Sequence, residues 1–349
     1  GKVLLRAAAE QHQRGVPLFE VWKALPYRDS FSPQLQSTFW SEGSASSYLP
    51  QIRRSGAALY VVGGWRDELR DQGLIARMNI PGARILIGDW LHCQNDGFAL
   101  AEEALRFFDR HLKGIDTGID ADDPVHYYVV GPNQWRSTRQ WPLPQAVQVP
   151  FALTARGLTE GGKGGAALNR SFAVNYDVVC KDAGFGPTMQ PCHLLGNGLS
   201  LASRPFRAAR EYTGHGIADV WLAAPGSDAN LFLYVEDVAP DGTVRVVTEG
   251  RLKASLRKLS QAPWALPGIP WHRAFAEDAQ PLQPGVPVRL QFDIMPTSWV
   301  FQPGHRVQFT FTGSDWRERA RDPAAQPATL TLISDAAHRS SVSLPLIGQ

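Results

Sequence analysis

Two short apolar runs, each followed by a polar residue, constrain the fold of this chain more than any other feature. Residues 58–67 read ALYVVGGWRD, and residues 84–92 read RILIGDWLH. Each run has the length and composition of a buried parallel strand. Open α/β sheets place their chemically active side chains just past the carboxyl ends of such strands. Asp67 and His92 hold those positions, and an acid followed by a base on consecutive strand ends is the order of a hydrolase triad.

The nucleophile of such a triad should come earlier in the chain, on a Gly-x-Ser-x-Gly turn. The sequence contains no such pentapeptide, and it begins with Gly1 rather than Met. We therefore expect the true amino terminus, and with it the serine, to lie upstream of these residues. Cys93 follows His92 directly, but adjacent loop residues rarely point at one another, so we interpret Cys93 as a small packing residue.

Composition excludes several classes of partner. The hydrophobic share of 44% and the charged share of 19% are ordinary for globular protein, and 349 residues are enough for two domains. The net charge of +2 comes without a basic run, so no nucleic-acid partner is expected. No apolar stretch reaches 18 residues, so no membrane span is expected. No His/Cys spacing resembles a zinc ligand set, and neither a metal nor another cofactor is predicted.

The chain changes character along its length. Residues 2–13 favour a helix, and residues 17–50 are typical of the short helices of a lid or cap. Strand and helix then alternate from 57 to 114, where the last helix, 97–113, directs an apolar face inward that includes Phe108 and Leu112. After Asp116 short β runs recur without helices, which indicates a sandwich or jelly roll. The runs expected to form strands are 124–130, 147–153, 220–223, 231–238, 244–252, 286–294 and 307–312.

An ordered set of motifs resembles the cocaine esterase and X-prolyl dipeptidyl peptidase group of serine hydrolases. The motifs follow the family order from about residue 17 to the end of the chain. Each is weak alone, but the set is specific. They are GGWRD (63–67), GDWLH (88–92), FFDRHLKG (107–114), PVHYYVVGPNQW (124–135) with WP (141–142), VEDVAPDG (235–242), GRLKASLR (250–257) and FQPGHRV (301–307).

The resemblance implies a division into parts. Residues 1–56 would be the end of the helical cap, 57–115 the last two strands and helices of an α/β-hydrolase domain, 116–145 a junction, and 146–349 a jelly-roll β-sandwich. It implies Asp67 as the triad acid, His92 as the base, and an amino-terminal segment of the same enzyme as the partner that carries the serine and the oxyanion hole.

The implied activity is hydrolysis of a small-molecule ester or amide through an acyl-enzyme. Family members include esterases, amino-acid ester hydrolases, acylases of β-lactam side chains and X-prolyl peptidases. One departure concerns the site. Where the family commonly has Tyr-Asp-Gly, this chain has Arg66, Asp67 and Glu68, and Glu68 adds negative charge near the substrate.

Other interpretations of the same residues stay open. Asp67 alone could cap the helix that begins near Leu69, and Asp71 and Asp89 compete for the role of acid. We interpret His305 as a packing or hydrogen-bonded residue of the β half. Trp65 and Trp90 are expected at the mouth of the site. Leu69 is a candidate either for the acyl pocket or for core packing.

Three further questions concern the whole chain. A non-catalytic β-sandwich that binds a ligand or partner is the alternative function, although such a module does not need an acid and a base in triad order. A homodimer is compatible with the sandwich face. Cys180 and Cys192 flank a Gly/Pro-rich loop and could form a disulfide or remain free.

Overall fold

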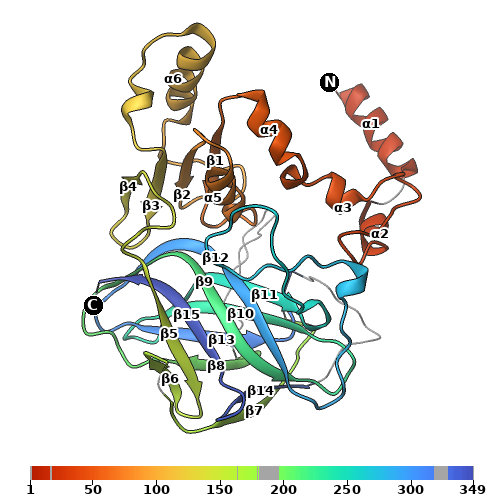
Figure 1. The fold of residues 1–349 in the computed structure, drawn as a ribbon, viewed down its shortest axis with the longest axis vertical. Helices are drawn as coiled ribbons and strands as arrows, with labels where there is room; N and C mark the ends of the chain where they lie inside the picture. Colours follow the sequence, from red (N-terminus) through yellow and green to blue (C-terminus); the bar gives the residue numbers. More distant parts are fainter. Residues whose placement is uncertain are drawn as a thin grey trace.

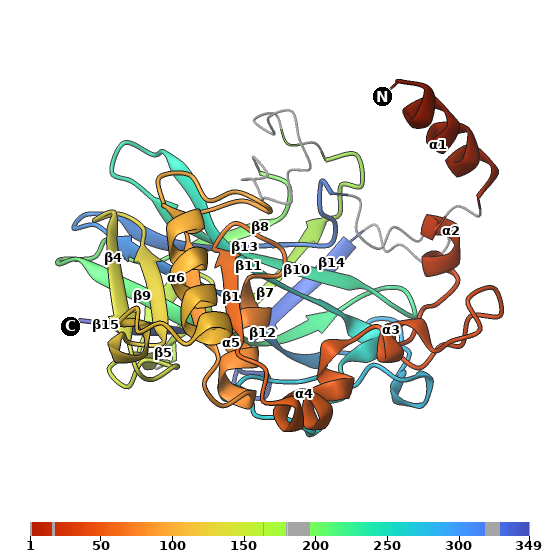
Figure 2. The same cartoon turned by 90° about the horizontal axis from the view of Figure 1, so that it is seen from above.

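The chain forms a group of short amino-terminal helices, a small sheet with two helices, and a large antiparallel β-sandwich (Figures 1 and 2). This order confirms the expected α/β part followed by an all-β part. The computed structural model describes residues 2–15, 18–162, 164–178, 180, 196–317 and 329–348.

Aromatic side chains hold part of the helical group together. Trp22 lies against Phe39 and Trp40, with ring centroids 6.1 and 6.3 Å apart, and Trp40 Nε1 donates a hydrogen bond to the Leu25 carbonyl. The first helix buries none of its residues against the described part of the chain, and it projects away from the sandwich in Figure 1. The elements are α1 (Lys2–Arg14), α2 (Leu18–Lys23), α3 (Phe39–Glu42), η1 (Ala45–Tyr48) and α4 (Leu49–Ser55).

The two apolar runs form neighbouring parallel strands. Tyr60 pairs with Arg84 and Gly64 with Gly88, so both runs end at the same edge of the sheet. The strand order is β1-β2-β3-β4, with β3 parallel to β2 and β4 antiparallel to β3. The elements are β1 (Tyr60–Gly64), α5 (Arg70–Asn79), β2 (Arg84–Gly88), α6 (Leu100–Lys113), η2 (Ile119–Ala121), β3 (Val125–Val129) and β4 (Gln134–Thr138).

The sandwich follows from strands whose side chains alternate between two faces. In β10, Leu231, Leu233 and Val235 face the main core, and Phe232 and Tyr234 pack on the opposite face. The elements are β5 (Val147–Thr154), β6 (Gly157–Glu160), β7 (Leu168–Ala173), β8 (Leu199–Ala202), β9 (Arg210–Ala223), β10 (Asn230–Val238), β11 (Val244–Lys253), η3 (Ala254–Leu256), η4 (Ala276–Asp278), β12 (Val288–Phe301), β13 (Arg306–Thr312), β14 (Thr329–Ser334) and β15 (Ser341–Ile347).

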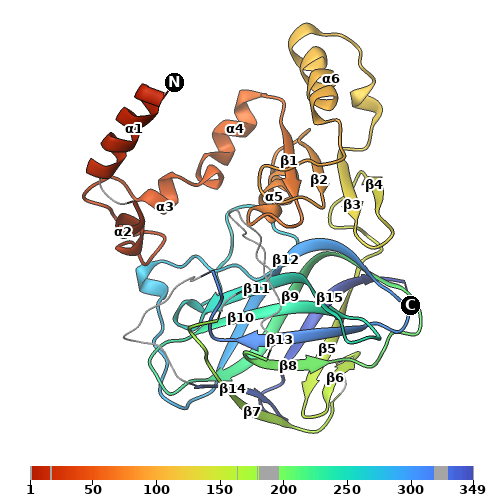
Figure 3. The same cartoon turned by 180° about the vertical axis from the view of Figure 1, so that it is seen from behind.

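The small sheet is joined to the sandwich by backbone hydrogen bonds as well as side chains. The amide of Val130 donates to the carbonyl of Ser298, and the amide of Val300 donates to the carbonyl of Val130. Helix α5 packs on β12. Figure 3 shows the small sheet seated on one end of the sandwich beside β12.

Two local expectations differ from the structure. The segment 116–145 contains β3 and β4, which extend the small sheet, because the amide of Ile85 in β2 bonds the carbonyl of Pro124 and sets the parallel pairing. In α6 only Phe107 is buried, while Phe108 is exposed and Leu112 is 77% exposed. The described part of the chain therefore covers only part of the apolar face of α6.

Candidate active site

The loops after β1 and β2 approach each other closely because glycine lies at the end of each strand. The amide of Trp65 donates to the carbonyl of Gly88, and the amide of Arg66 donates to the carbonyl of Trp90, at 2.8 and 3.0 Å. A Cβ on Gly64 would lie 2.1 Å from the Trp90 oxygen, so no larger residue fits there without moving the backbone. The two loops are thereby held against one another.

This approach brings Asp67 and His92 together. Asp67 Oδ2 lies 3.1 Å from His92 Nδ1, and Asp67 Oδ1 accepts a hydrogen bond from the amide of Leu69 at 2.9 Å. The carboxylate therefore both supports the turn into α5 and orients the imidazole. The Asp67 side chain is 14% exposed and that of His92 is 47% exposed. His92 Nε2 has no hydrogen-bond partner among the described residues, which leaves it available for proton transfer.

The two competing acids are placed elsewhere. Asp89 forms a bidentate ion pair with the Arg66 guanidinium, which ties the two strand-end loops together and occupies the Asp89 carboxylate. Asp71 lies in the first turn of α5, where burial raises its pKa. Among the three carboxylates, Asp67 is the one that contacts His92.

A cavity of about 450 Å³ lies beside this pair. Asp67, His92 and Leu69 line it, together with β1 residues. Cys93 also lines it and is an exposed free cysteine, so the interpretation of Cys93 as a packing residue is wrong. Its φ of 60° lies in the left-handed region.

The two tryptophans near the site do not line this cavity. Trp65 is buried, donates Nε1 to the Tyr128 carbonyl at 2.7 Å and stacks on Trp141. Trp90 is also buried and donates Nε1 to the Asp96 carbonyl at 3.1 Å. Both indoles fix the strand-end loops, and of the three candidate substrate contacts only Leu69 lines the cavity.

A buried charge network that no sequence motif predicts joins this region to the sandwich. Arg70 Nη1 donates to the Trp65 carbonyl at 2.6 Å, and Arg70 Nη2 lies 3.6 Å from Glu249 Oε1 in β11. Arg317 forms two hydrogen bonds to Glu249 and also pairs with Asp315. Burial alone would raise the pKa of Glu249, but the hydrogen bonds from Arg317 and the positive charges of Arg317, Arg70 and Arg251 outweigh it, and this pKa is lowered.

Two further Asp–His pairs occur among the described residues, both in the sandwich. His305 Nδ1 lies 2.8 Å from Asp237 Oδ1, as expected of a hydrogen-bonded residue of the β half. His338 Nδ1 lies 3.1 Å from Asp335 Oδ1 in a turn before β15. A contact between a carboxylate and a histidine therefore does not by itself identify a catalytic pair.

The described residues contain neither a candidate metal site nor a helix that could span a membrane, and they include only one cysteine of the pair considered above. Within the described ranges, no group of three or more His, Cys, Asp or Glu side chains could hold a metal ion. None of the helices that the structure describes combines the length and apolar character required to cross a membrane. Of that cysteine pair, Cys192 lies outside the described residues.

The sequence of this chain is similar to those of known proteins. Residues 117–343 match the family model described as the X-Pro dipeptidyl-peptidase C-terminal non-catalytic domain. The chain is 34% identical over 334 residues to a Mycobacterium bovis protein named "Putative serine esterase", covering 87% of this chain and 52% of that protein. It is 24% identical over 299 residues to the cocaine esterase of a Rhodococcus species, covering 75% and 49%. The chain thus spans about half the length of these curated relatives.

Solved structures agree on the fold. A CocE/NonD family hydrolase from Staphylococcus aureus superposes with a TM-score of 0.73 at 17% identity, covering 95% of this chain and 59% of that one. An α-amino acid ester hydrolase superposes with a TM-score of 0.68 at 18% identity, covering 97% and 62%. Together with the sequence matches, these likenesses confirm the resemblance seen in the motifs. The chain belongs to the cocaine esterase and X-prolyl dipeptidyl peptidase family of serine hydrolases.

Proposed function

We propose that this chain supplies the acid and the base of a serine hydrolase that cleaves a carboxylic ester or amide. Asp67 is the acid and His92 the base. The observation that carries the proposal is the 3.1 Å contact between Asp67 and His92 Nδ1, with Nε2 unpartnered among the described residues and a cavity alongside.

The geometry suits a two-step acyl transfer. Asp67 holds the proton of His92 on Nδ1, so Nε2 takes the proton of the serine hydroxyl as its oxygen attacks the substrate carbonyl. The resulting imidazolium gives that proton to the leaving alcohol or amine when the carbonyl–heteroatom bond breaks. A water molecule then attacks the acyl-enzyme and gives a proton to Nε2. The imidazolium returns that proton to the serine oxygen as the acyl–oxygen bond breaks, which releases the acid product and restores the serine hydroxyl.

The nucleophile is proposed to lie on an amino-terminal segment beyond these 349 residues, and two surfaces support this. Among the described strands β1 pairs only with β2, so its other edge has no strand beside it. Val62 in β1 and Leu105, Phe108 and Leu112 in α6 are exposed. An unpaired parallel edge and an uncovered apolar helix face are what the removal of neighbouring hydrolase strands and helices would leave.

A non-catalytic binding module is the second candidate function. The family model that matches residues 117–343 is described as non-catalytic, and this favours a binding function for that part of the chain. Asp67 and His92 lie outside that range, so a non-catalytic sandwich and a catalytic strand-end pair are compatible within one chain. Intact mass of the purified protein separates the two cases, since only the hydrolase requires a serine-bearing segment to accompany this chain.

The first test is covalent labelling of the purified enzyme with a fluorophosphonate probe. We expect no labelled serine within these 349 residues and one labelled serine on the accompanying segment. Labelling of Ser44, Ser47 or Ser314 would refute this division of the triad.

The second test is substitution of the pair itself. We expect His92→Ala to abolish hydrolysis of a chromogenic ester, and Asp67→Asn to lower kcat/KM by about 10⁴-fold with the fold intact by circular dichroism. His338→Ala is the matched control, because its ring has the same 3.1 Å contact with a carboxylate but lies in the sandwich. Near-normal turnover in His92→Ala, or an equal loss in His338→Ala, would contradict the assignment.

A further inference from the structure

The two terminal strands of the sandwich sheet meet and leave a cavity beside their contact. β6 and β8 stand at opposite ends of the strand order, yet a Cβ on Gly157 in β6 would lie 2.5 Å from the carbonyl oxygen of Ala202 in β8. The adjacent cavity has a volume of about 710 Å³. It is formed by β6 and the loop between β8 and β9, and it shares no lining residue with the cavity at Asp67 and His92.

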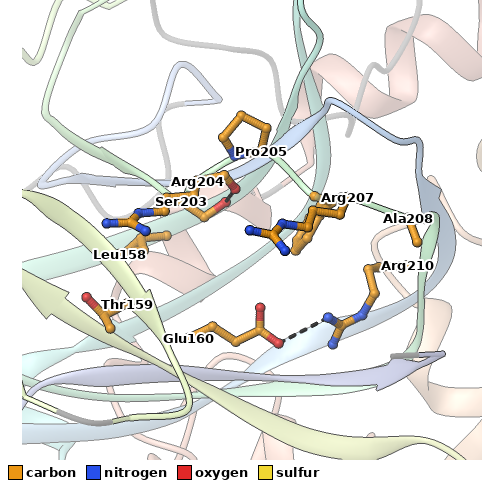
Figure 4. A pocket seen from close by; sticks show the side chains of 10 residues that line it. Leu158, Thr159, Glu160, Ser203, Arg204, Pro205, Arg207, Ala208 and Arg210 are labelled. Carbon is orange, nitrogen blue, oxygen red and sulfur yellow. Dashed lines mark hydrogen bonds and ion pairs between the residues drawn. The ribbon is translucent and has the colours of Figure 1, made fainter.

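The charges of this cavity are unbalanced. Arg204, Arg207 and Arg210 line it against a single acid, Glu160 (Figure 4). Arg210 Nη1 donates to Glu160 Oε1 at 3.1 Å, and Arg210 Nε is buried without a hydrogen-bond partner among the described residues. The guanidinium groups of Arg204 and Arg207 likewise have no partner within the part of the chain that the structure describes. Positive charge therefore remains available for a ligand.

The loop that carries these arginines is fixed to the sandwich. The amide of Ser203 donates to the carbonyl of Val307, and the amide of Phe206 donates to the carbonyl of His305. Phe206 is buried, and the Arg210 guanidinium lies over its ring at 5.7 Å from the centroid. The arginines thus project from a held backbone, which lowers the ordering cost of binding.

We propose that this cavity binds a small organic anion that carries carboxylate or phosphate groups. The planar fork of a guanidinium matches either group with two parallel hydrogen bonds. Arg204, Arg207 and Arg210 would hold the anionic groups. The buried Leu158 and Phe206 would contact the ligand's carbon skeleton. This site is independent of the proposed hydrolase function.

The experiment is isothermal titration calorimetry on the intact protein, with citrate and inorganic phosphate as separate probes at constant ionic strength. We expect saturable binding of at least one probe, and about tenfold or greater weakening in the double variant Arg204→Gln, Arg207→Gln. Arg339→Gln is the matched control, because Arg339 is an exposed arginine of the sandwich without a side-chain partner among the described residues. This control should bind like the unmodified protein.

A second variant moves the affinity in the opposite direction. Glu160→Gln removes the one acid of the cavity and frees Arg210, so binding should tighten several-fold. Binding of citrate alone assigns a carboxylate ligand, and binding of phosphate alone assigns a phosphate ligand. The proposal is overturned if neither probe saturates, if the double variant binds as well as the unmodified protein, or if Arg339→Gln weakens binding equally.

Discussion

Removal of the buried charges between α5 and the sandwich should destabilise the chain in a definite order. Arg70 and Glu249 have side chains that are 3% and 4% exposed. Glu249 neutralises two buried arginines, since Arg317 binds it with two hydrogen bonds and Arg70 lies 3.6 Å away. It also lies 3.8 Å from the exposed guanidinium of Arg251. Glu249→Ala leaves two buried cations without this partner and should cost about 3–5 kcal/mol of unfolding free energy.

Arg70→Ala should cost less than Glu249→Ala. Glu249 keeps its bonds to Arg317, and the principal loss is the hydrogen bond from Arg70 to the Trp65 carbonyl. A buried hydrogen bond to a charged group contributes about 1.5–3 kcal/mol, and this is the expected cost of Arg70→Ala.

The comparison variant is Arg66→Ala, which breaks the ion pair with Asp89 on the surface. An exposed pair of this kind contributes about 0–1 kcal/mol. Unfolding free energies come from urea denaturation followed by tryptophan fluorescence and circular dichroism, whose coincidence tests the two-state assumption. Equal costs for Arg66→Ala and Glu249→Ala, or a larger cost for Arg70→Ala than for Glu249→Ala, would refute the reasoning.

Two further predictions concern the strand-end loops and the pH dependence of stability. Gly64→Ala forces a methyl group against the Trp90 carbonyl and should cost about 1–3 kcal/mol and about 100-fold in kcat/KM, whereas Gly164→Ala, which has open space around it, should change neither. Burial raises the pKa of Asp293 to about 6, so the folded chain holds a proton there that the unfolded chain has released above about pH 4. Stability from this group is therefore complete below about pH 4 and is lost as the pH rises through about 6. Asp293→Asn should raise the free energy of unfolding by about 3 kcal/mol near pH 8 and barely change it near pH 4, and an equal gain at both pH values would contradict the assignment.

Local sequence predicted those parts of the fold whose signal lies within one element. The apolar run 231–238 gives β10 (Asn230–Val238), and 244–252 gives β11 (Val244–Lys253). The local sequence also predicted the two strand ends, because glycine and tryptophan mark where each parallel strand stops. The parallel register then places both ends at one edge of the sheet.

Features that depend on distant partners could not be predicted in this way. Residues 124–130 alternate like a sandwich strand, but β3 joins β2 through a parallel pairing that the alternation does not encode. The apolar face of α6 predicts burial, yet Phe108 and Leu112 are exposed in the structure. Arg70 resembles any other helix arginine until Glu249 is brought beside it from the sandwich.

The three Asp–His pairs show what the sequence contributed to the candidate site. Asp67–His92 and Asp335–His338 have the same 3.1 Å contact, and Asp237–His305 is closer still at 2.8 Å, so the distance alone does not favour any one of them. The first pair differs in its surroundings. It follows two parallel strands and it borders a cavity. These surroundings are properties of the strand-end motif, which is why the sequence already pointed to Asp67 and His92. The other two pairs arise from contacts within the sandwich and hold its turns and strand entries together.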